Sequence, residues 1–233
     1  MRFSVAEDRW WKAQVKRRLL PAGKAPRRIR AGLLAGLTMQ LDFAHQTQRW
    51  LGLQERELYP WMRRFAAGIQ TAIDVGANDG MYTLYFLART SARKIFSFDA
   101  AAESLGELRE NLGLNGLGSD VRLEVVAQKV AAQPGDGSTT LDSFAASIGS
   151  PCLVKADIDG GEAEMLRGAQ GLLRAPGVRW IIEVHSKALE QECLRILREA
   201  NYQTRIVRNA WWRHLLPELR PGELNHWLVA YRS

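Results

Sequence analysis

The chain has few of the residues from which covalent frameworks and metal clusters are built. Its 233 residues include two cysteines, Cys152 and Cys193, and four histidines. Two cysteines do not suffice for a disulfide framework, so a reducing, cytoplasmic location is expected. The sequence has no run of 18 or more apolar residues, and its first 20 residues lack the continuous apolar core of a secretory signal. We therefore expect no segment that spans a bilayer.

Acidic residues are scarce at the N-terminus, where the basic charge is concentrated. Residues 1–31 contain ten lysines and arginines against Glu7 and Asp8, a net charge of +8. The whole chain carries +7, so the remainder sums to −1. A helix ending at Pro21 is predicted, and its apolar face would carry Trp10, Trp11, Val15 and Leu19.

Such a basic segment has several interpretations. It can be a structural helix whose tryptophans pack on its own domain. Residues 1–30 can instead dock to an anionic membrane surface or to a protein partner, which would place the protein peripherally at a membrane. Nucleic acid is the weakest of these alternatives.

The most informative motif is residues 71–83, a short apolar strand that ends in Asp74, passes through a glycine-rich loop and opens a helix. Gly76 and Gly80 allow a close approach of the backbone to a ligand, because glycine has no Cβ and takes positive φ readily. A second strand over 94–98 ends at Asp99, a residue suited to ribose hydroxyls. This pairing predicts an adenosine-containing cofactor at the carboxyl edge of an α/β sheet.

The spacing of the loop narrows the choice of cofactor. Asn78 stands where a dinucleotide fingerprint has its middle glycine, and no Gly-Lys-Ser/Thr follows, so a P-loop is excluded. Asp74 and Asp79 suit a cationic ligand better than a pyrophosphate. The sequence therefore favours S-adenosylmethionine, which carries a sulfonium and an amino group.

Strand and helix patterns alternate along the rest of the chain, which predicts a parallel sheet covered on both faces. We expect residues 1–68 to form an extension of a basic helix, a hairpin within 31–43 and a lead-in helix over 55–65. Residues 69–233 are expected to form the main domain. Its predicted strands are 71–75, 94–98, 121–126, 152–157, 178–184, 203–208 and 226–231, and its predicted helices are 81–89, 102–113, 140–147, 162–173 and 187–200.

An ordered set of motifs resembles the FkbM-type family of S-adenosylmethionine-dependent methyltransferases over residues 69–205. The motifs are 74–83, Phe96-Ser-Phe-Asp99, 111–115, 140–144, 153–162, 165–169 and Ile182-Glu-Val-His185. The resemblance implies the Rossmann-like class I fold, with a mostly parallel seven-stranded sheet whose last strand is antiparallel. The chain departs from the family pattern at Asp99-Ala100, where Glu-Pro is usual, and at Asp159, where Glu is usual.

Cofactor contacts are expected at the carboxyl ends of the first strands, where open α/β sheets bind ligands. Asp74 is predicted near the methionyl amino group and Asp99 on the ribose hydroxyls. The full predicted set is Asp74, Gly76, Ala77, Asn78, Gly80, Tyr82, Thr83, Asp99 and Asp157.

Catalytic candidates follow the central strands. Asp157 is expected near the methyl group, and His185 is the candidate general base because its ordinary pKa lies near operating pH. Glu183 shares a strand face with His185, and Asp159 follows Asp157. Each also has a structural interpretation, Asp159 as a helix cap and His185 as a strand-end residue bonded to backbone. The spacing defines no coordination shell, so no metal is assigned, although these side chains are acceptable hard ligands.

The predicted function is O-methylation of a small-molecule or natural-product hydroxyl, such as that of a sugar, polyketide or peptide. This acceptor class is implied by the resemblance. The segment 157–160 lacks the Pro-Pro-aromatic turn of amino-directed nucleic-acid methyltransferases, but ribose methylation of RNA through the basic arm stays open. A catalytically silent cofactor-binding module is the other alternative.

Overall fold

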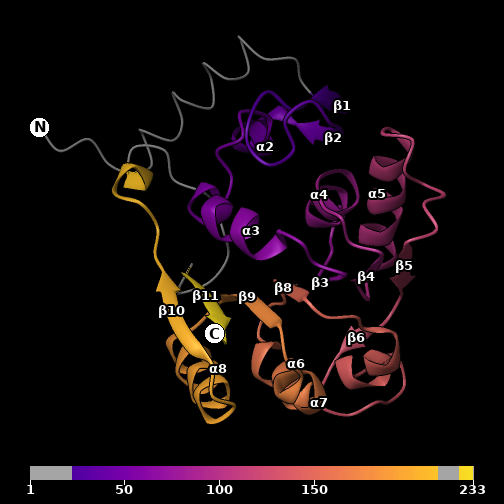
Figure 1. Cartoon of the computed structure of the whole chain (residues 1–233). Coiled ribbons are helices and arrows are strands. Elements are labelled where there is room, and N and C mark those ends of the chain that lie inside the picture. The colour runs from indigo at the N-terminus through magenta and orange to yellow at the C-terminus, as the bar shows by residue number, and fades with distance from the viewer. Residues whose placement is uncertain (1–22, 215–225, 233) are drawn as a thin grey trace, which may run out of the picture. The chain divides into compact units, whose positions relative to one another are not determined.

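The structure is a computed structural model that describes residues 23–214 and 226–232. The chain divides into two compact units, Met1–Arg56 and Glu57–Ser233, and each is described by itself (Figure 1). The helix predicted around Trp10 and Trp11 lies outside the described residues. In the ranges that are described, no helix has the length and apolar character that a membrane span requires.

The first unit contains a small antiparallel hairpin and one helix. Its elements are β1 (Lys24–Arg28), β2 (Thr38–Asp42) and α2 (Phe43–Trp50). The hairpin predicted within 31–43 therefore begins earlier than expected. Gly32 and Gly36 take φ values of 86° and 87° and lie in the connection between the strands, so the first strand precedes them. Asp42 caps α2 by accepting a hydrogen bond from the backbone N–H of Ala44.

The second unit is built on a seven-stranded sheet of order β10-β11-β9-β8-β3-β4-β5. Adjacent strands from β9 to β5 pair in parallel, whereas β11 is antiparallel to both β9 and β10. The predicted class I methyltransferase fold is thereby confirmed. The strands are β3 (Thr71–Val75), β4 (Lys94–Phe98), β5 (Leu123–Val126), β8 (Cys152–Ala156), β9 (Val178–Val184), β10 (Gln203–Val207) and β11 (His226–Tyr231).

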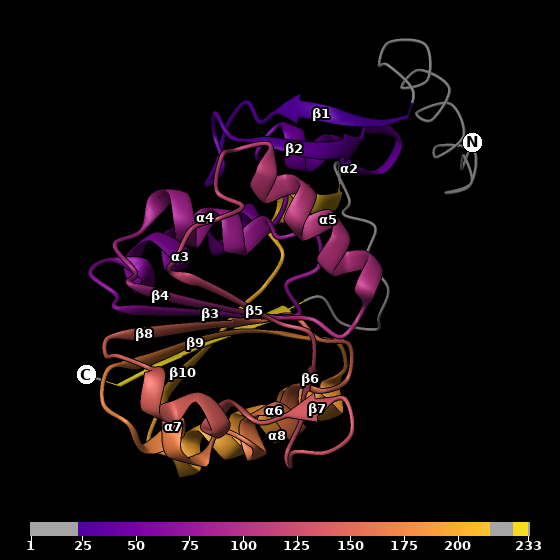
Figure 2. The same ribbon diagram turned by 90° about the vertical axis from the view of Figure 1, so that its right-hand side faces the viewer.

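Helices cover both faces of this sheet, with α3, α4 and α5 on one side and α6, α7 and α8 on the other (Figure 2). Two short strands, β6 (Lys129–Val130) and β7 (Ser138–Thr139), form a separate parallel pair. The helical segments are η1 (Arg56–Leu58), α3 (Tyr59–Ala66), α4 (Met81–Arg89), α5 (Ala102–Gly113), η2 (Leu141–Ser147), α6 (Glu162–Arg167), α7 (Gln170–Arg174), α8 (Lys187–Glu199) and η3 (Trp211–His214).

Three predicted helices differ in detail. The helix expected over 162–173 is two helices, because Gly168 and Ala169 take non-helical φ and ψ values. Residue 168 must be glycine, since a Cβ there would lie 2.1 Å from the carbonyl oxygen of Ala131. The lead-in helix begins at Tyr59 with Pro60 in its first turn, where proline removes no helical hydrogen bond. Residues 141–147 form a 3-10 helix, capped by Thr140.

The central strands are buried at every position, as expected for parallel strands with helices on both faces. In the register between β3 and β8, Val75 lies opposite Ala156. The loop that follows β3 and the loop that follows β8 therefore leave the sheet side by side. This shared edge brings the glycine motif next to Asp157.

Candidate active site

The loop between β3 and α4 requires glycine at its first position. Gly76 has φ +78°, and a Cβ built on it would lie 1.9 Å from the carbonyl oxygen of Asp157. The backbone N–H groups of Gly76 and Ala77 both donate to the carbonyl of Phe98 at 2.9 Å, which holds the loop against β4. Gly80, at φ +84°, is the N-cap of α4. The ends of β3 and β8 thus meet at a turn whose first residue, Gly76, has no side chain.

Asp99 lies at the end of β4 and faces the glycine loop. Its carboxylate accepts hydrogen bonds at 2.9 Å from the backbone N–H groups of Asn78 and Ala101, one on each oxygen. Asn78 adopts a left-handed conformation, φ 48°, which asparagine tolerates better than most residues. Each carboxylate oxygen has a further lone pair, so the side chain can still accept from hydroxyl groups.

Asp74 is buried within β3. Its carboxylate accepts a hydrogen bond from the Thr83 hydroxyl at 2.7 Å, and that hydroxyl also bonds to Ser97 at 2.7 Å. Burial raises the pKa of Asp74 to about 6, against the opposing effects of Thr83 and of the nearby ammonium group of Lys155. Asp74, which is predicted to lie near the cofactor's amino group, is thus held in place by Thr83 of α4. Ser97 of β4 bonds to Thr83 in turn.

Lys155 is a site residue that the sequence analysis missed. Its side chain is fully buried in β8, where Nζ donates to the carbonyl of Ala156 at 3.3 Å. The same Nζ lies 4.8 Å from the ring centroid of Tyr82 and 4.0 Å from a carboxylate oxygen of Asp157. One available signal was a lysine within an otherwise apolar strand, since lysine is almost never fully buried without a partner.

His185 follows β9 and is oriented by Glu162, the first residue of α6. Nδ1 of His185 donates to Oε1 of Glu162 at 2.6 Å. Glu162 is fully buried, and its other oxygen has no hydrogen-bond partner in the described structure. This hydrogen bond raises the pKa of His185 above its usual value, although burial of the ring opposes the effect. The sequence pattern did not identify Glu162 as the partner of His185.

The other ring nitrogen of His185 faces two aspartates from the loop after β8. Nε2 lies 3.0 Å from Oδ1 of Asp159 and 3.6 Å from Oδ1 of Asp157. The carboxyl group of Asp159 is largely exposed and that of Asp157 is partly exposed. Because Glu162 occupies Nδ1, the nitrogen available for proton exchange is Nε2.

Glu183 lies on β9 two residues before His185, but its carboxylate is hydrogen-bonded to Trp227. Its carboxylate accepts from the indole N–H of Trp227, on β11, at 3.0 Å. The residue that orients His185 is therefore Glu162. Ligand atoms of Asp157, Glu183 and His185 lie within 4.8 Å of one another, so these three side chains have the donor types and proximity to hold a cation.

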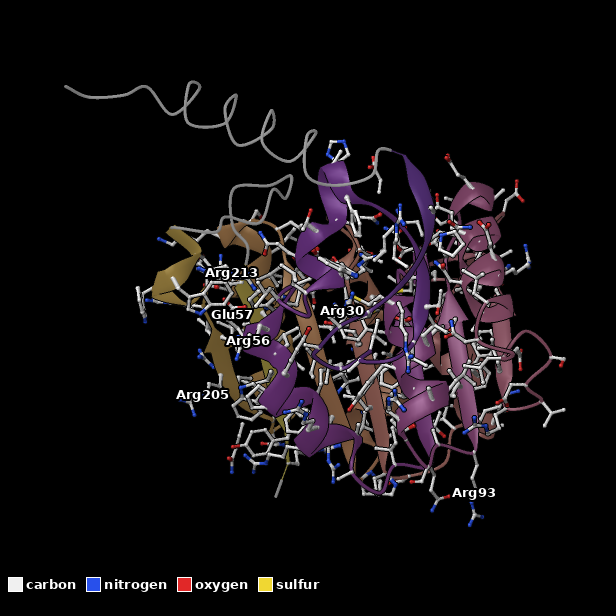
Figure 3. The ribbon with its side chains drawn as sticks, turned by 90° about the horizontal axis from the view of Figure 1, so that it is seen from above. Arg30, Arg56, Glu57, Arg93, Arg205 and Arg213 are labelled. Carbon is white, nitrogen blue, oxygen red and sulfur yellow. The ribbon has the colours of Figure 1, made fainter. Side chains whose placement is uncertain are left out.

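The segment between β10 and β11 contains Trp211 and Trp212, which are suited to an acceptor pocket, and it is described as far as residue 214. Arg213 forms a buried ion pair with Glu57 at 2.6 Å (Figure 3) and its guanidinium lies 4.2 Å from the ring centroid of Trp212. The Trp211 side chain is exposed. This 3-10 segment is therefore held against η1, which precedes α3.

The residues around the glycine loop fit a cationic adenosine cofactor. Asp99 keeps hydrogen-bonding capacity toward hydroxyls, and the loop backbone is free of side chains at Gly76 and Gly80. Asp74, Asp157 and Asp159 surround the same edge with negative charge. Together with the sheet order, this arrangement is that of the class I methyltransferases.

A comparison with protein families gives the more particular result. Residues 136–204 match the family described as the methyltransferase FkbM domain. The resemblance to FkbM-type methyltransferases that the motifs indicate is therefore confirmed. The matched segment is less than a third of the chain, and S-adenosylmethionine is the cofactor that a class I methyltransferase fold implies.

Solved structures agree on the fold. Methyltransferase FkbM from Methylobacillus flagellatus aligns with a TM-score of 0.54 at 16% identity, over 71% of this chain and 44% of that one. A SAM-dependent O-methyltransferase from Thermotoga maritima aligns with a TM-score of 0.50 at 17% identity, over 76% of this chain and 64% of that one. Precorrin-6y C5,15-methyltransferase from Geobacter metallireducens aligns with a TM-score of 0.51 at 12% identity, over 77% of this chain and 89% of that one. No protein with a curated function matches the chain.

Proposed function

We propose that this chain transfers a methyl group from S-adenosylmethionine to a hydroxyl oxygen of a small or medium-sized metabolite. The observation that carries the proposal is the imidazole of His185. It is anchored at Nδ1 by buried Glu162 and presents Nε2 to Asp157 and Asp159 at the edge occupied by the glycine loop. A sugar, polyketide or peptide acceptor is proposed on the family resemblance.

The cofactor would be held by the residues that follow β3 and β4. Asp99 would accept from the ribose hydroxyls, and the backbone of residues 76–80 would lie against the cofactor. Asp74 would contribute negative charge from within the strand. When bound, the cofactor supplies a methyl group on a sulfonium, which is already a good leaving group.

The chain must then position the acceptor and remove its proton. Nε2 of neutral His185 has a lone pair that can receive the hydroxyl proton, while Nδ1 keeps its own proton on Glu162. The carboxylates of Asp157 and Asp159 stabilise the imidazolium that results, because both lie within 4 Å of Nε2. Holding the acceptor oxygen in line with the breaking bond supplies the remaining rate enhancement.

The proposal can be tested with the purified full-length chain. Calorimetric titration with S-adenosylmethionine measures cofactor binding. Formation of S-adenosylhomocysteine is then followed with a panel of hydroxylated sugars, polyketides, peptides and RNA, and mass spectrometry locates the new methyl group. Methoxy formation on a metabolite supports the proposal, whereas methylation of nitrogen or of RNA ribose overturns it. Cofactor binding without turnover on any acceptor supports a silent module instead.

The same assay with a chelator tests whether Asp157, Glu183 and His185 hold a metal ion. If turnover persists in excess EDTA and after gel filtration, the acceptor hydroxyl is deprotonated by the protein's own side chains without a metal ion. Loss of turnover that Mn²⁺ or Mg²⁺ restores would assign these residues to a cation and contradict His185 as the general base.

A further inference from the structure

The first unit contains a hollow whose lining residues are not among those assigned to the candidate active site. It has a volume of about 770 Å³ and is lined by residues of the hairpin and of α2, among them Arg27, Arg28 and Arg30. Ligand sites in proteins commonly have volumes of 300–1,000 Å³. The hollow is therefore large enough for a group the size of a nucleotide.

Arg27 has a donor that lacks a partner. Its Nε is buried and finds no hydrogen-bond partner in the described structure. A buried N–H of a charged group normally has an acceptor, because leaving it unpaired costs free energy. Arg27 lines the hollow, so an anionic ligand there would offset this incompletely paired charge.

Two aromatic rings hold the arginines in place. The guanidinium of Arg27 lies 4.9 Å from the ring centroid of Phe43, and that of Arg30 lies 5.4 Å from the ring centroid of Trp50. A guanidinium over a ring face keeps the donors at its edge free to bond outward. Arg28 is fixed differently, since its Nε donates to the carbonyl of Gly36 at 3.2 Å. The three cations are thus oriented before any ligand arrives.

The charge around the hollow is one-sided. Residues 23–56 contain six lysines and arginines against Asp42 and Glu55, and neither acid lines the hollow. Three cations around one cavity favour a compact ligand with two or more negative charges. A phosphodiester chain has one charge per phosphate and is better matched by a stripe of basic residues.

We propose that Arg27, Arg28 and Arg30 form a binding site for a phosphate monoester or pyrophosphate group. The guanidinium donors match phosphate oxygens in geometry and charge. These arginines belong to the first unit, and the proposal does not depend on the function proposed above.

The test uses the full-length chain and inorganic pyrophosphate as the probe, titrated by calorimetry at low and at physiological salt. We expect saturable binding that Arg27→Gln and Arg30→Gln each weaken about 10-fold or more, as loss of a charge-assisted hydrogen bond predicts. Arg30→Lys should weaken it less than Arg30→Gln. Arg56→Gln is the matched control (Figure 3), because Arg56 is an exposed arginine of the same unit that does not line the hollow. It should stay within twofold of the wild type.

Two further binding measurements identify the molecule that carries the phosphate group. ADP tests a soluble ligand, and phosphatidylcholine vesicles containing phosphatidylinositol 4-phosphate test a lipid headgroup, with phosphatidylserine vesicles as the charge control. Equal weakening in Arg56→Gln, or no saturable pyrophosphate binding by a wild-type protein with a cooperative thermal transition, overturns the site. Single-stranded RNA binding that depends on Arg30 without pyrophosphate binding overturns it as well.

Discussion

Oε1 of Glu162 lies 2.6 Å from Nδ1 of His185, although the two residues belong to elements on different parts of the chain. Glu162 opens α6 and is fully buried, whereas His185 follows β9 at the edge of the site. A buried carboxylate that accepts from Nδ1 stabilises the protonated ring and leaves Nε2 for the substrate. This relationship governs the pH dependence expected of the protein.

The first prediction concerns Glu162→Gln. Only neutral His185 can accept a proton, so turnover should rise with pH through the raised pKa of His185 and then level off. A neutral amide at residue 162 removes the main cause of that raised pKa. The midpoint of the rise should therefore move to lower pH, as measured by kcat between pH 5 and 9. An unchanged midpoint would contradict the assignment of Glu162.

The second prediction concerns His185→Gln. Loss of a general base lowers turnover by about 100-fold or more, while the dissociation constant for S-adenosylmethionine should change by less than about threefold. His226→Gln is a matched control, because His226 also lies near a glutamate, 3.3 Å from Glu190, but outside the proposed site. Equal losses in the two variants would show that the effect is structural.

The third prediction concerns Asp99→Ala. Removing an acceptor of charge-assisted hydrogen bonds costs about 1.5–3 kcal/mol, so cofactor affinity should fall about 10- to 150-fold. Asp136→Ala removes an exposed carboxylate elsewhere and should leave affinity unchanged. Because Asp99 also binds two backbone N–H groups, the thermal transition of each variant is measured alongside. Unaltered cofactor binding in a folded Asp99→Ala protein would remove Asp99 from the ribose site.

The fourth prediction concerns stability and Asp74→Asn. The pKa of Asp74 is raised to about 6 in the folded protein by burial. The carboxyl group therefore stabilises the fold fully below its ordinary pKa, and this stability is lost as pH rises through about 6. The amide does not ionise, so the unfolding free energy of the variant relative to wild type should be greater at pH 8 than at pH 4 by about 2 kcal/mol. Urea unfolding at both pH values measures it, and a pH-independent difference would contradict the prediction.

The fifth prediction compares two glycines with positive φ. A Cβ on Gly76 would overlap the Asp157 carbonyl, whereas one on Gly68, at φ +69°, meets no atom within 4 Å. Gly68→Ala should cost about 1–2 kcal/mol for the left-handed backbone. Gly76→Ala adds a backbone clash and should cost about 4 kcal/mol or more. Similar unfolding free energies for the two variants would mean that the strand ends are not packed as described.

Sequence pattern was sufficient for most strands and helices, whereas the antiparallel last strand was expected from the family resemblance. Strands at 71–75, 94–98 and 178–184 and helices at 81–89 and 102–113 have the bounds that their patterns predict. These elements are local, because hydrophobic periodicity and flanking glycines specify them without reference to distant residues. The glycine loop and the acids after each strand could be located for the same reason, since parallel strands bring their carboxyl ends to one edge.

The tertiary structure decided the contacts between residues that are distant along the chain. The pairing of Glu162 with His185 and of Glu183 with Trp227, and the burial of Lys155 beside Tyr82, depend on how α6, β11 and α4 pack on the sheet. The need for glycine at residue 168 likewise depends on tertiary structure, because the backbone of Ala131 passes close to it. Periodicity records which face of an element is buried, whereas the partner it meets there is set by packing between elements. The sequence by itself therefore determined the fold and the edge that carries the site, and only packing selected the residue that orients His185.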